Sequence, residues 1–487
     1  MAYVGYQWEV DPDTAAADCA ARRRHAQRDR LTVRYDWMAV PVFTDRRPPA
    51  LDRGGTARGR RRLAAAVKAG PGARRGLRDY AGFRKFWTAS TVSGFGSYVT
   101  ALAVRVLVVV TLHGSALQVG LVNAAGWLPY LLFGVLTGVL VDRARRRPLL
   151  VVTDLARGVL LLAVPVLAVS HHLQLPVLIV VMVMFGALSL VNDAAFQSFV
   201  PRLVPAGLLT PAHARLDQSD AVAQTSGPAL AGGLVSLLGA PWAVLVDAAS
   251  YLVSGVLIAR ITVVEPPPPP RPVTRGGVRA EAREGLRWVY THPTLRSFAV
   301  GTHAWFVFNG VAGAVLVPFA LRTLGLTPFG LGLALSAAGV GGLLGSLAAT
   351  RLGTKFGAGR LVVACWAAQG VAYVLLALTA ADWSGWLLFG TGQLLFGLAL
   401  GAENAPSMGY RQAVTPDRLQ GRMNTTMRSV NRAMIVIGAP IGGLLADTIG
   451  YRPMLWIVAG GFIAVAAGLG LSRYRTAHLG DVHTRPA

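Results

Sequence analysis

The sequence predicts an all-α integral membrane protein with twelve transmembrane helices in two pseudo-symmetric six-helix bundles. Three observations support this fold class. Of 487 residues, 53% are hydrophobic and only 14% are charged, whereas soluble domains carry about 25% charged residues. Apolar runs long enough to cross about 30 Å of hydrocarbon recur from Tyr80 onward. The second set of these runs repeats the first.

Twelve apolar runs follow one another, with a linker between the sixth and the seventh. The linker begins at Glu265, contains five prolines and leads into a basic amphipathic stretch, 279–292, which is typical of a helix at a membrane surface. The expected spans are 83–110, 117–141, 148–169, 175–199, 214–238, 241–261, 295–321, 328–352, 360–380, 384–408, 419–446 and 452–472.

Residues 1–79 differ from the rest of the chain. They hold 17 Lys or Arg against 9 Asp or Glu and have no run long enough for a signal peptide or a span, so we predict a disordered basic extension. Translation starting later, for instance at Met38, is the alternative. The expected parts are the extension 1–79, an N-terminal six-helix bundle 80–262, a cytosolic linker with its amphipathic helix 263–293, a C-terminal six-helix bundle 294–475 and a tail 476–487.

The internal repeat appears as a constant offset between similar residues. Five anchor positions coincide without a gap at a single offset, and near the start of each half the offset is one residue longer. Such a duplication of six helices is found in transporters. The matching positions are Phe185-Gly186 with Phe396-Gly397, Pro205 with Pro416, Gly227 with Gly438, Gly232 with Gly443, and Gly239 with Gly450.

The basic residues predict the orientation. The formal net charge is +24, and of the 30 Lys and Arg after residue 79 only Arg322 and Arg452 fall in outer loops if both termini are cytosolic. The positive-inside rule therefore predicts a multi-pass protein of the cell membrane with both termini in the cytosol. This distribution explains the positive charge without a nucleic-acid partner.

Several chemistries have no support in the sequence. Cys19 and Cys365 are the only cysteines, which excludes a disulfide scaffold or a cysteine zinc site. The P-loop pattern is absent, and His171-His172 has no metal-ligand partners nearby. We therefore expect no cofactor, no metal and no enzymatic activity.

A motif with a glycine, an aspartate and several arginines separates the second and third spans. Its residues are Gly138, Asp142, Arg143, Arg146 and Arg147. In this position it resembles the loop motif of the major facilitator superfamily, G-x-L-x-D-R-x-G-R-R, with an arginine at 145 where that family often has glycine. The resemblance covers residues 80–475 and implies the major facilitator fold, working by alternating access around a central cavity.

A second motif lies in the fifth span. Gly227, Pro228, Gly232 and Gly233 are similar to the G-P-x-x-G-G element of proton-coupled exporters in that superfamily, although Ala231 replaces one glycine. Gly-Pro frees a carbonyl group and kinks a helix, while the glycines offer a flat packing face. The element either serves packing alone or seals the helix against leak during export.

Short phrases resemble the branch that contains the enterobactin and macrolide exporters. This resemblance implies proton-driven export of a bulky amphipathic small molecule by a monomer in the lipid bilayer. An importer or uniporter of a small polar nutrient, and a non-transporting scaffold or sensor, are the alternatives. The phrases are 154–158 (DLARG), 201–205 (PRLVP) and 284–287 (EGLR).

Ionisable residues inside a membrane are costly, so each requires an explanation. When the two halves are aligned by the repeat, Asp193 and Glu403 fall one residue apart, and each lies roughly 10 Å inside the membrane. These two residues are the candidates for proton coupling. Asp193 could instead brace the Asp142 loop through an arginine. Asp154 and Arg157 are expected to form an ion pair on one helix, with Arg157 extending toward the interface.

Other polar residues of the spans are candidates for the cavity wall. Arg105 either faces the cavity or extends to the outer interface. Trp127, His303, Asn309 and Gln369 either line the cavity or form hydrogen bonds between helices.

Charges of opposite sign occupy related loops in the two halves, which predicts ion pairs that close the cytosolic side. One latch would join Asp142 to Arg422 or Arg428. The other would join Asp217 or Asp220 to Arg351 or Lys355. Partly exposed pairs of this kind are weak enough to break in each cycle.

Overall fold

The computed structural model describes residues 76–141, 144–263, 265 and 275–477. It contains the expected twelve helices long and apolar enough to cross a membrane, and the described residues include no β-strand. The predicted fold class is thereby confirmed. The spanning helices are α3 (Ala81–Val106), α4 (Ala116–Val141), α5 (Arg146–Val169), α6 (Leu175–Leu203), α7 (Leu209–Leu238), α8 (Ala240–Ala259), α10 (Pro293–Pro318), α11 (Pro328–Phe356), α12 (Ala358–Ala377), α13 (Trp383–Ala413), α14 (Asp417–Ile449) and α15 (Tyr451–Gly470).

Most of the predicted extension, 1–75, lies outside the described residues, and so do 478–487 of the predicted tail. The end of the extension is ordered, because Leu77–Asp79 form a short 3₁₀ helix. The backbone N–H of Gly76 donates a hydrogen bond to the Asp79 carboxylate at 2.8 Å, which closes this turn.

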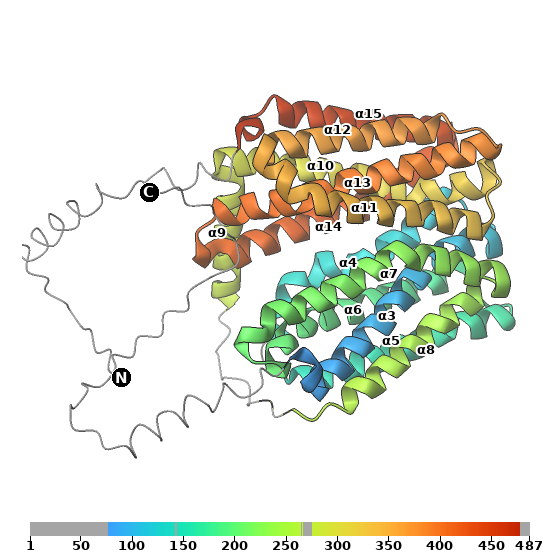
Figure 1. Ribbon diagram of the computed structural model, residues 1–487. Helices are drawn as coiled ribbons and strands as arrows, with labels where there is room; N and C mark the ends of the chain where they lie inside the picture. Colours follow the sequence, from blue (N-terminus) through green and yellow to red (C-terminus); the bar gives the residue numbers. More distant parts are fainter. Residues whose placement is uncertain (1–75, 142–143, 264, 266–274, 478–487) are drawn as a thin grey trace, which may run out of the picture. The chain divides into compact units, whose positions relative to one another are not determined.

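The helices form two groups, α3–α8 and α10–α15 (Figure 1). The duplication is visible in the helix bounds: the starts of α3 and α10 are related by the longer of the two repeat offsets, and those of α8 and α15 by the shorter. Each first helix also ends in a five-residue π-helical segment, Leu107–Thr111 and Phe319–Thr323, and these segments correspond in the repeat. The amphipathic helix α9 (Arg275–Thr291) follows the linker and packs on α14 and α10.

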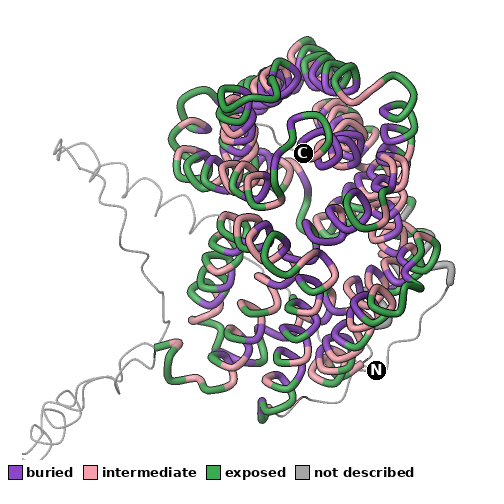
Figure 2. Tube along the Cα trace, turned by 90° about the vertical axis from the view of Figure 1, so that its right-hand side faces the viewer, coloured by how far each residue is buried: buried purple, intermediate pink, exposed green. Residues whose placement is uncertain are grey.

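Burial follows the pattern required in lipid. Leucine and valine side chains remain exposed on the outer faces of the bundles, whereas buried positions face the bundle interiors (Figure 2). In water such faces would favour association, but in a bilayer they contact acyl chains.

The two ends of the helices differ in charge. We call the end with the loop 204–208 and helix α9 the basic end, and the end with the loops 112–115 and 324–327 the neutral end. The helix pairs α4·α14 and α7·α11 join the two halves.

At the neutral end, the contacts within the two helix pairs α4·α14 and α7·α11 are alike. Gly443 of α14 leaves no room for a Cβ beside Ala116, and Gly232 of α7 leaves none beside Pro328. The backbone N–H groups of Ala116 and Leu117 donate hydrogen bonds to the Asp447 carboxylate, both at 2.9 Å.

Ser236 of the first half holds the position that corresponds to Asp447 in the repeat. Its hydroxyl oxygen accepts a hydrogen bond from the N–H of Phe329 at 3.1 Å. Each half therefore caps the first turn of a helix in the other half, α4 or α11, where N–H groups lack partners within the helix. Arg322 adds hydrogen bonds from its guanidinium to the carbonyl groups of Val109 and Gly114.

Candidate functional site

Three adjoining cavities lie within and between the bundles. The first, of about 310 Å³, is lined by α3, α4, α5, α6 and α8. The second, also about 310 Å³, lies between α4, α6 and α14, and the third, about 340 Å³, is lined by α10 and α12–α14. Tyr130 and Asp193 belong to the first two cavities, and Arg428 belongs to the second and third. These shared residues connect the cavity of one bundle to that of the other.

The second cavity extends toward the basic end. Thr137, Gln197 and Thr425 line it, and each lies near the basic end of its helix. Because the glycine contacts and caps join the halves at the neutral end, this conformation is closed there and hollow toward the basic end.

Asp193 lies where the two bundles meet. The Tyr130 hydroxyl donates a hydrogen bond to Asp193 Oδ2 at 2.7 Å, and Asp193 interacts electrostatically with Arg157 and Arg432. The Arg432 guanidinium, from the other bundle, lies 3.8 Å from the centre of the Trp127 ring. Asp193 therefore faces cations of both halves, and the Asp142 loop that it could brace lies outside the described residues.

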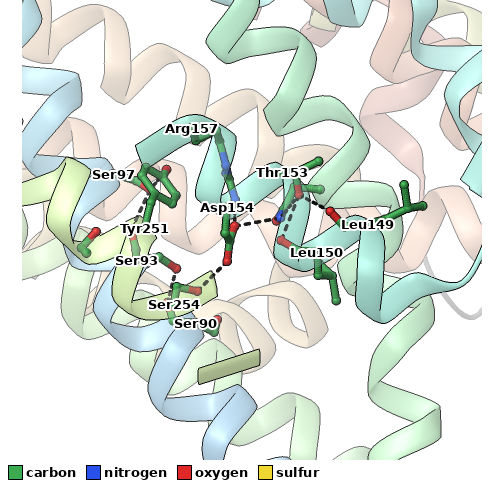
Figure 3. Close-up of polar contacts among 12 residues, drawn as sticks. Ser90, Ser93, Ser97, Leu149, Leu150, Thr153, Asp154, Arg157, Tyr251 and Ser254 are labelled. Atoms are coloured by element: carbon green, nitrogen blue, oxygen red, sulfur yellow. Dashed lines mark hydrogen bonds and ion pairs between the residues drawn. The ribbon is translucent and has the colours of Figure 1, made fainter. Parts of the chain in front are cut away.

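A buried polar network surrounds Asp154 (Figure 3). Asp154 forms an ion pair with Arg157 and accepts hydrogen bonds from Asn192 Nδ2 at 2.9 Å and Ser254 Oγ at 2.6 Å. Arg157 does not extend toward the interface, contrary to expectation. It is 7% exposed, and its guanidinium lies 4.2 Å from the centre of the Tyr251 ring, because α8 supplies an aromatic face and α5 a carboxylate.

Glu403 is also buried, but its surroundings differ. Its carboxyl group interacts with Gln369 and Trp366 of α12, yet Glu403 Oε2, Gln369 Nε2 and Trp366 Nε1 form no hydrogen bond. Gln369 Oε1 already accepts a hydrogen bond from Trp305 Nε1 at 2.5 Å. Glu403 lines the third cavity together with Arg411.

The repeat superimposes these two environments. The N-terminal quartet consists of Asp154, Arg157, Asn192 and Asp193, and the C-terminal quartet of Trp366, Gln369, Glu403 and Asn404. The pairs on α5 and α12 follow the longer repeat offset, and the pairs on α6 and α13 follow the shorter one, as in the surrounding sequence.

The remaining cavity candidates fall into three groups. Arg105 and Trp127 line the first cavity. His303 joins helices instead: its Nδ1 is 2.8 Å from Asn431 Oδ1 and its Nε2 is 2.8 Å from the hydroxyl oxygen of Tyr290 on α9. Gln369 also bonds across helices, whereas Asn309 is half-buried and lines none of the three cavities.

Of the predicted latch residues that the structure describes, Asp217 and Asp220 form no ion pair with Arg351 or Lys355. Asp217, Asp220, Arg351 and Lys355 are exposed, and Asp220 interacts with Tyr98 of its own bundle. Arg422 pairs with Glu284 and, at 3.4 Å, with Glu281, both on α9. The proposed closed arrangement of these charges stays a prediction, and its partner Asp142 lies outside the described residues.

Glu265, the first residue of the linker, accepts hydrogen bonds from the loop motif, and the sequence did not predict this contact. Gly138 lies within α4, and Asp142 and Arg143 lie outside the described residues. The backbone N–H groups of Arg146 and Arg147 donate hydrogen bonds to the Glu265 carboxylate at 2.7 and 2.8 Å. Glu265 therefore caps the start of α5, where a negative charge is favoured.

The glycines of the fifth span pack against the opposite bundle. α7 continues as a helix through Pro228, and the backbone at Gly232 lies against Pro328 and Phe329 of α11, while Gly332 approaches the Pro228 carbonyl group. Gly227 instead lies on Tyr98, and Gly233 faces the Phe329 ring. The motif thus forms part of the neutral-end closure.

Sequence reasoning missed Asp247. This residue lies in the middle of α8 and is 0% exposed. An acidic residue within a 20-residue apolar helix is the signal that could have found it.

Comparison with known proteins agrees with this architecture. A family described as transmembrane secretion effector, of the major facilitator superfamily, matches residues 77–484. The chain belongs to this family. The transporter is 28% identical over 372 residues to the multidrug efflux pump Tap of Mycolicibacterium fortuitum, which covers 74% of this chain and 88% of the pump.

Further relatives and structures extend the comparison. Macrolide efflux protein A of Streptococcus pyogenes is 23% identical over 395 residues, 80% of this chain and 94% of that protein. The nucleoside transporter NupG (TM-score 0.66, 11% identity, 83% of this chain and 100% of that one) shares the fold. So does a bacterial homologue of ferroportin in an inward-facing state (TM-score 0.63, 15% identity, 82% and 100%). The transporter is therefore a multi-pass membrane protein of the efflux branch with a small-molecule substrate.

Proposed function

We propose that the transporter exports amphipathic small molecules across the cell membrane in exchange for protons. The observation that carries this proposal is Glu403, a buried carboxyl group on the cavity wall with an unpartnered oxygen. Glu403 forms no ion pair among the described residues, and an unpaired buried carboxylate is costly, so proton binding there changes the stability of one conformation relative to the other. Asp193, facing Arg157 and Arg432 at the junction of the halves, is the second coupling group.

The orientation follows from charge. The basic end faces the cytosol, with both termini on that side, because arginines gather there. The closure at the neutral end then makes this an inward-facing state, in which the cavities can take up substrate from the cytosol or the inner leaflet. Aromatic and apolar groups beside the arginines suit an amphipathic molecule, and efflux of drugs by the relatives supports export. A single chain supplies both halves, so the monomer is the working unit.

Inverted membrane vesicles with an acidic lumen test direction and coupling. We expect them to accumulate a radiolabelled macrolide or a fluorescent amphipathic dye, and to lose it when a protonophore is added. Glu403→Gln should abolish the proton-dependent accumulation, whereas Asp382→Asn, which removes an exposed carboxylate that caps α13, should not. Uptake only in right-side-out vesicles would show an importer instead, and the absence of movement across a broad panel would favour a scaffold or sensor.

A further inference from the structure

Asp247 of α8 is an acid in an unusual position. It is 0% exposed, and only its Oδ1 has a partner, the Ser250 hydroxyl at 2.9 Å, while Oδ2 forms no hydrogen bond. On the neighbouring helix α3, Gly96 lies directly against the carboxyl group and leaves no space for a side chain. The packing of α3 on α8 therefore depends on glycine at 96 and on the size of this acid.

A short path joins Asp247 to the first cavity. Thr100 lies one turn after Gly96 on α3 and faces Asp247, and its buried Oγ1 forms no hydrogen bond of normal geometry in this conformation. Thr100 lines the cavity, so one hydroxyl group separates the buried acid from the space where Asp193 lies. A hydroxyl can accept a proton on one side while it donates its own on the other.

The charged groups around Asp247 do not neutralise it. Arg157 of α5 interacts with it electrostatically, but this guanidinium is paired with Asp154 and also faces Asp193 of α6. Tyr251, one turn further along α8, lies against Arg157 and hydrogen bonds to Ser97. One arginine thus interacts with three carboxyl groups. It forms an ion pair with Asp154, whereas neither Asp193 nor Asp247 forms an ion pair among the described residues.

We propose that Asp247 is a further proton-binding group of the transport cycle. In the conformation described here its carboxyl group holds a proton. When the halves rearrange, the O–H bond of Asp247 breaks, and its proton passes through the Thr100 hydroxyl to the first cavity. The carboxylate that remains is then stabilised by Arg157. This inference rests on the proposed proton-coupled export and adds a further proton to it.

Infrared difference spectroscopy on the full-length reconstituted protein tests the site with protons alone. Between neutral and alkaline pH, the wild type should lose the C=O band of a neutral carboxyl group that Asp247→Asn lacks. Ser250→Ala, which removes only the existing hydrogen bond, should shift this band without abolishing its pH response. A band that never changes in the wild type, or spectra that are identical in Asp247→Asn, would overturn the proposal.

Transport measurements separate this proposal from the proposed function. Asp247→Asn, close in shape to the neutral acid, should still move a radiolabelled macrolide but with one proton fewer per molecule, and Thr100→Val should slow proton-driven transport at least tenfold. Unchanged stoichiometry and rate in both variants would refute a role for Asp247 while leaving export intact. If the wild type moves no protons, coupled export is wrong, and the infrared titration alone decides whether Asp247 exchanges a proton.

Discussion

The N-terminal and C-terminal quartets occupy equivalent positions but differ in how their polar atoms are satisfied. In the N-terminal quartet, Asp154 has an ion pair and two hydrogen bonds from side chains outside the pair, and the unpartnered buried atom is Arg157 Nε. In the C-terminal quartet Trp366 and Gln369 face the Glu403 carboxyl group, but Trp366 Nε1, Gln369 Nε2 and Glu403 Oε2 form no hydrogen bond of normal geometry.

The difference shows how one ancestral position can serve two purposes. A saturated network holds its helices in one arrangement, since any movement breaks several hydrogen bonds. An unsaturated one gains hydrogen bonds when it moves or takes up a proton. The N-terminal quartet is therefore expected to be mainly structural, with Asp193 alone turned to the cavity, and the C-terminal quartet to be the switch.

The largest effect should come from breaking the saturated network. Asp154→Asn leaves the buried charge of Arg157 without its counter-ion, which costs about 3–5 kcal/mol. Denaturant unfolding of the purified protein in detergent would measure it. Glu403→Gln is the matched change in the other quartet, and because Glu403 forms no ion pair among the described residues, its stability should stay within about 1 kcal/mol of the wild type. Equal losses in the two variants would contradict the comparison.

A second test transfers the chemistry of one quartet into the other. Gln369→Arg places a guanidinium where Arg157 stands in the repeat and gives Glu403 a permanent counter-ion. Glu403 should then remain charged, so we expect proton-driven accumulation in inverted vesicles to fall at least tenfold, about 1.4 kcal/mol. Gln369→Met provides an uncharged control of similar length. Full activity of the arginine variant would show that Glu403 is not the switch.

The two halves can also be compared through the helix caps that Asp447 and Ser236 form at the neutral end. Asp447→Ala removes two hydrogen bonds to a carboxylate, and Ser236→Ala removes one to a hydroxyl. We expect the first to shift the conformational equilibrium toward opening at the neutral end by about 1–3 kcal/mol and the second by about 0.5–1.5 kcal/mol. Labelling of a cysteine introduced at this end would report both shifts. A larger effect from Ser236→Ala than from Asp447→Ala would contradict the prediction that the Asp447 cap is the stronger one.

The smallest effect concerns His292, which lies outside the membrane. Its titration contributes to the pH dependence of the protein's stability. Its Nδ1 accepts a hydrogen bond from the N–H of Leu295 at 3.3 Å, and burial lowers the pKa of His292 below its usual value. Between that lowered pKa and about 6.5 the unfolded chain binds more protons, so stability rises with pH through this window and falls on acidification.

His292→Asn keeps a cap that does not titrate. Its melting temperature should therefore fall less than that of the wild type between about pH 7.5 and pH 5.5. An equal fall in the two proteins would assign the acid sensitivity to another group.

Several features were predictable from sequence because they depend on local properties. Hydropathy located the twelve spans, since each must satisfy its own backbone in lipid. The repeat offset placed Glu403 in the slot of Asn192. What the sequence could not show was Arg157 turned inward onto Tyr251, because which face of a helix meets which neighbour depends on packing between distant segments.

Hydropathy, the internal repeat and the positions of the ionisable residues are enough to predict a two-bundle membrane protein and where its charges lie along the helices. The tertiary structure decided which charges are paired. Asp154, Asp193 and Asp247 look alike in sequence as acids in apolar helices, but one is saturated, one faces a cavity and one is sealed beside Gly96. The physical reason is that the cost of a buried charge depends on the atoms around it, and those atoms come from helices far apart in the chain.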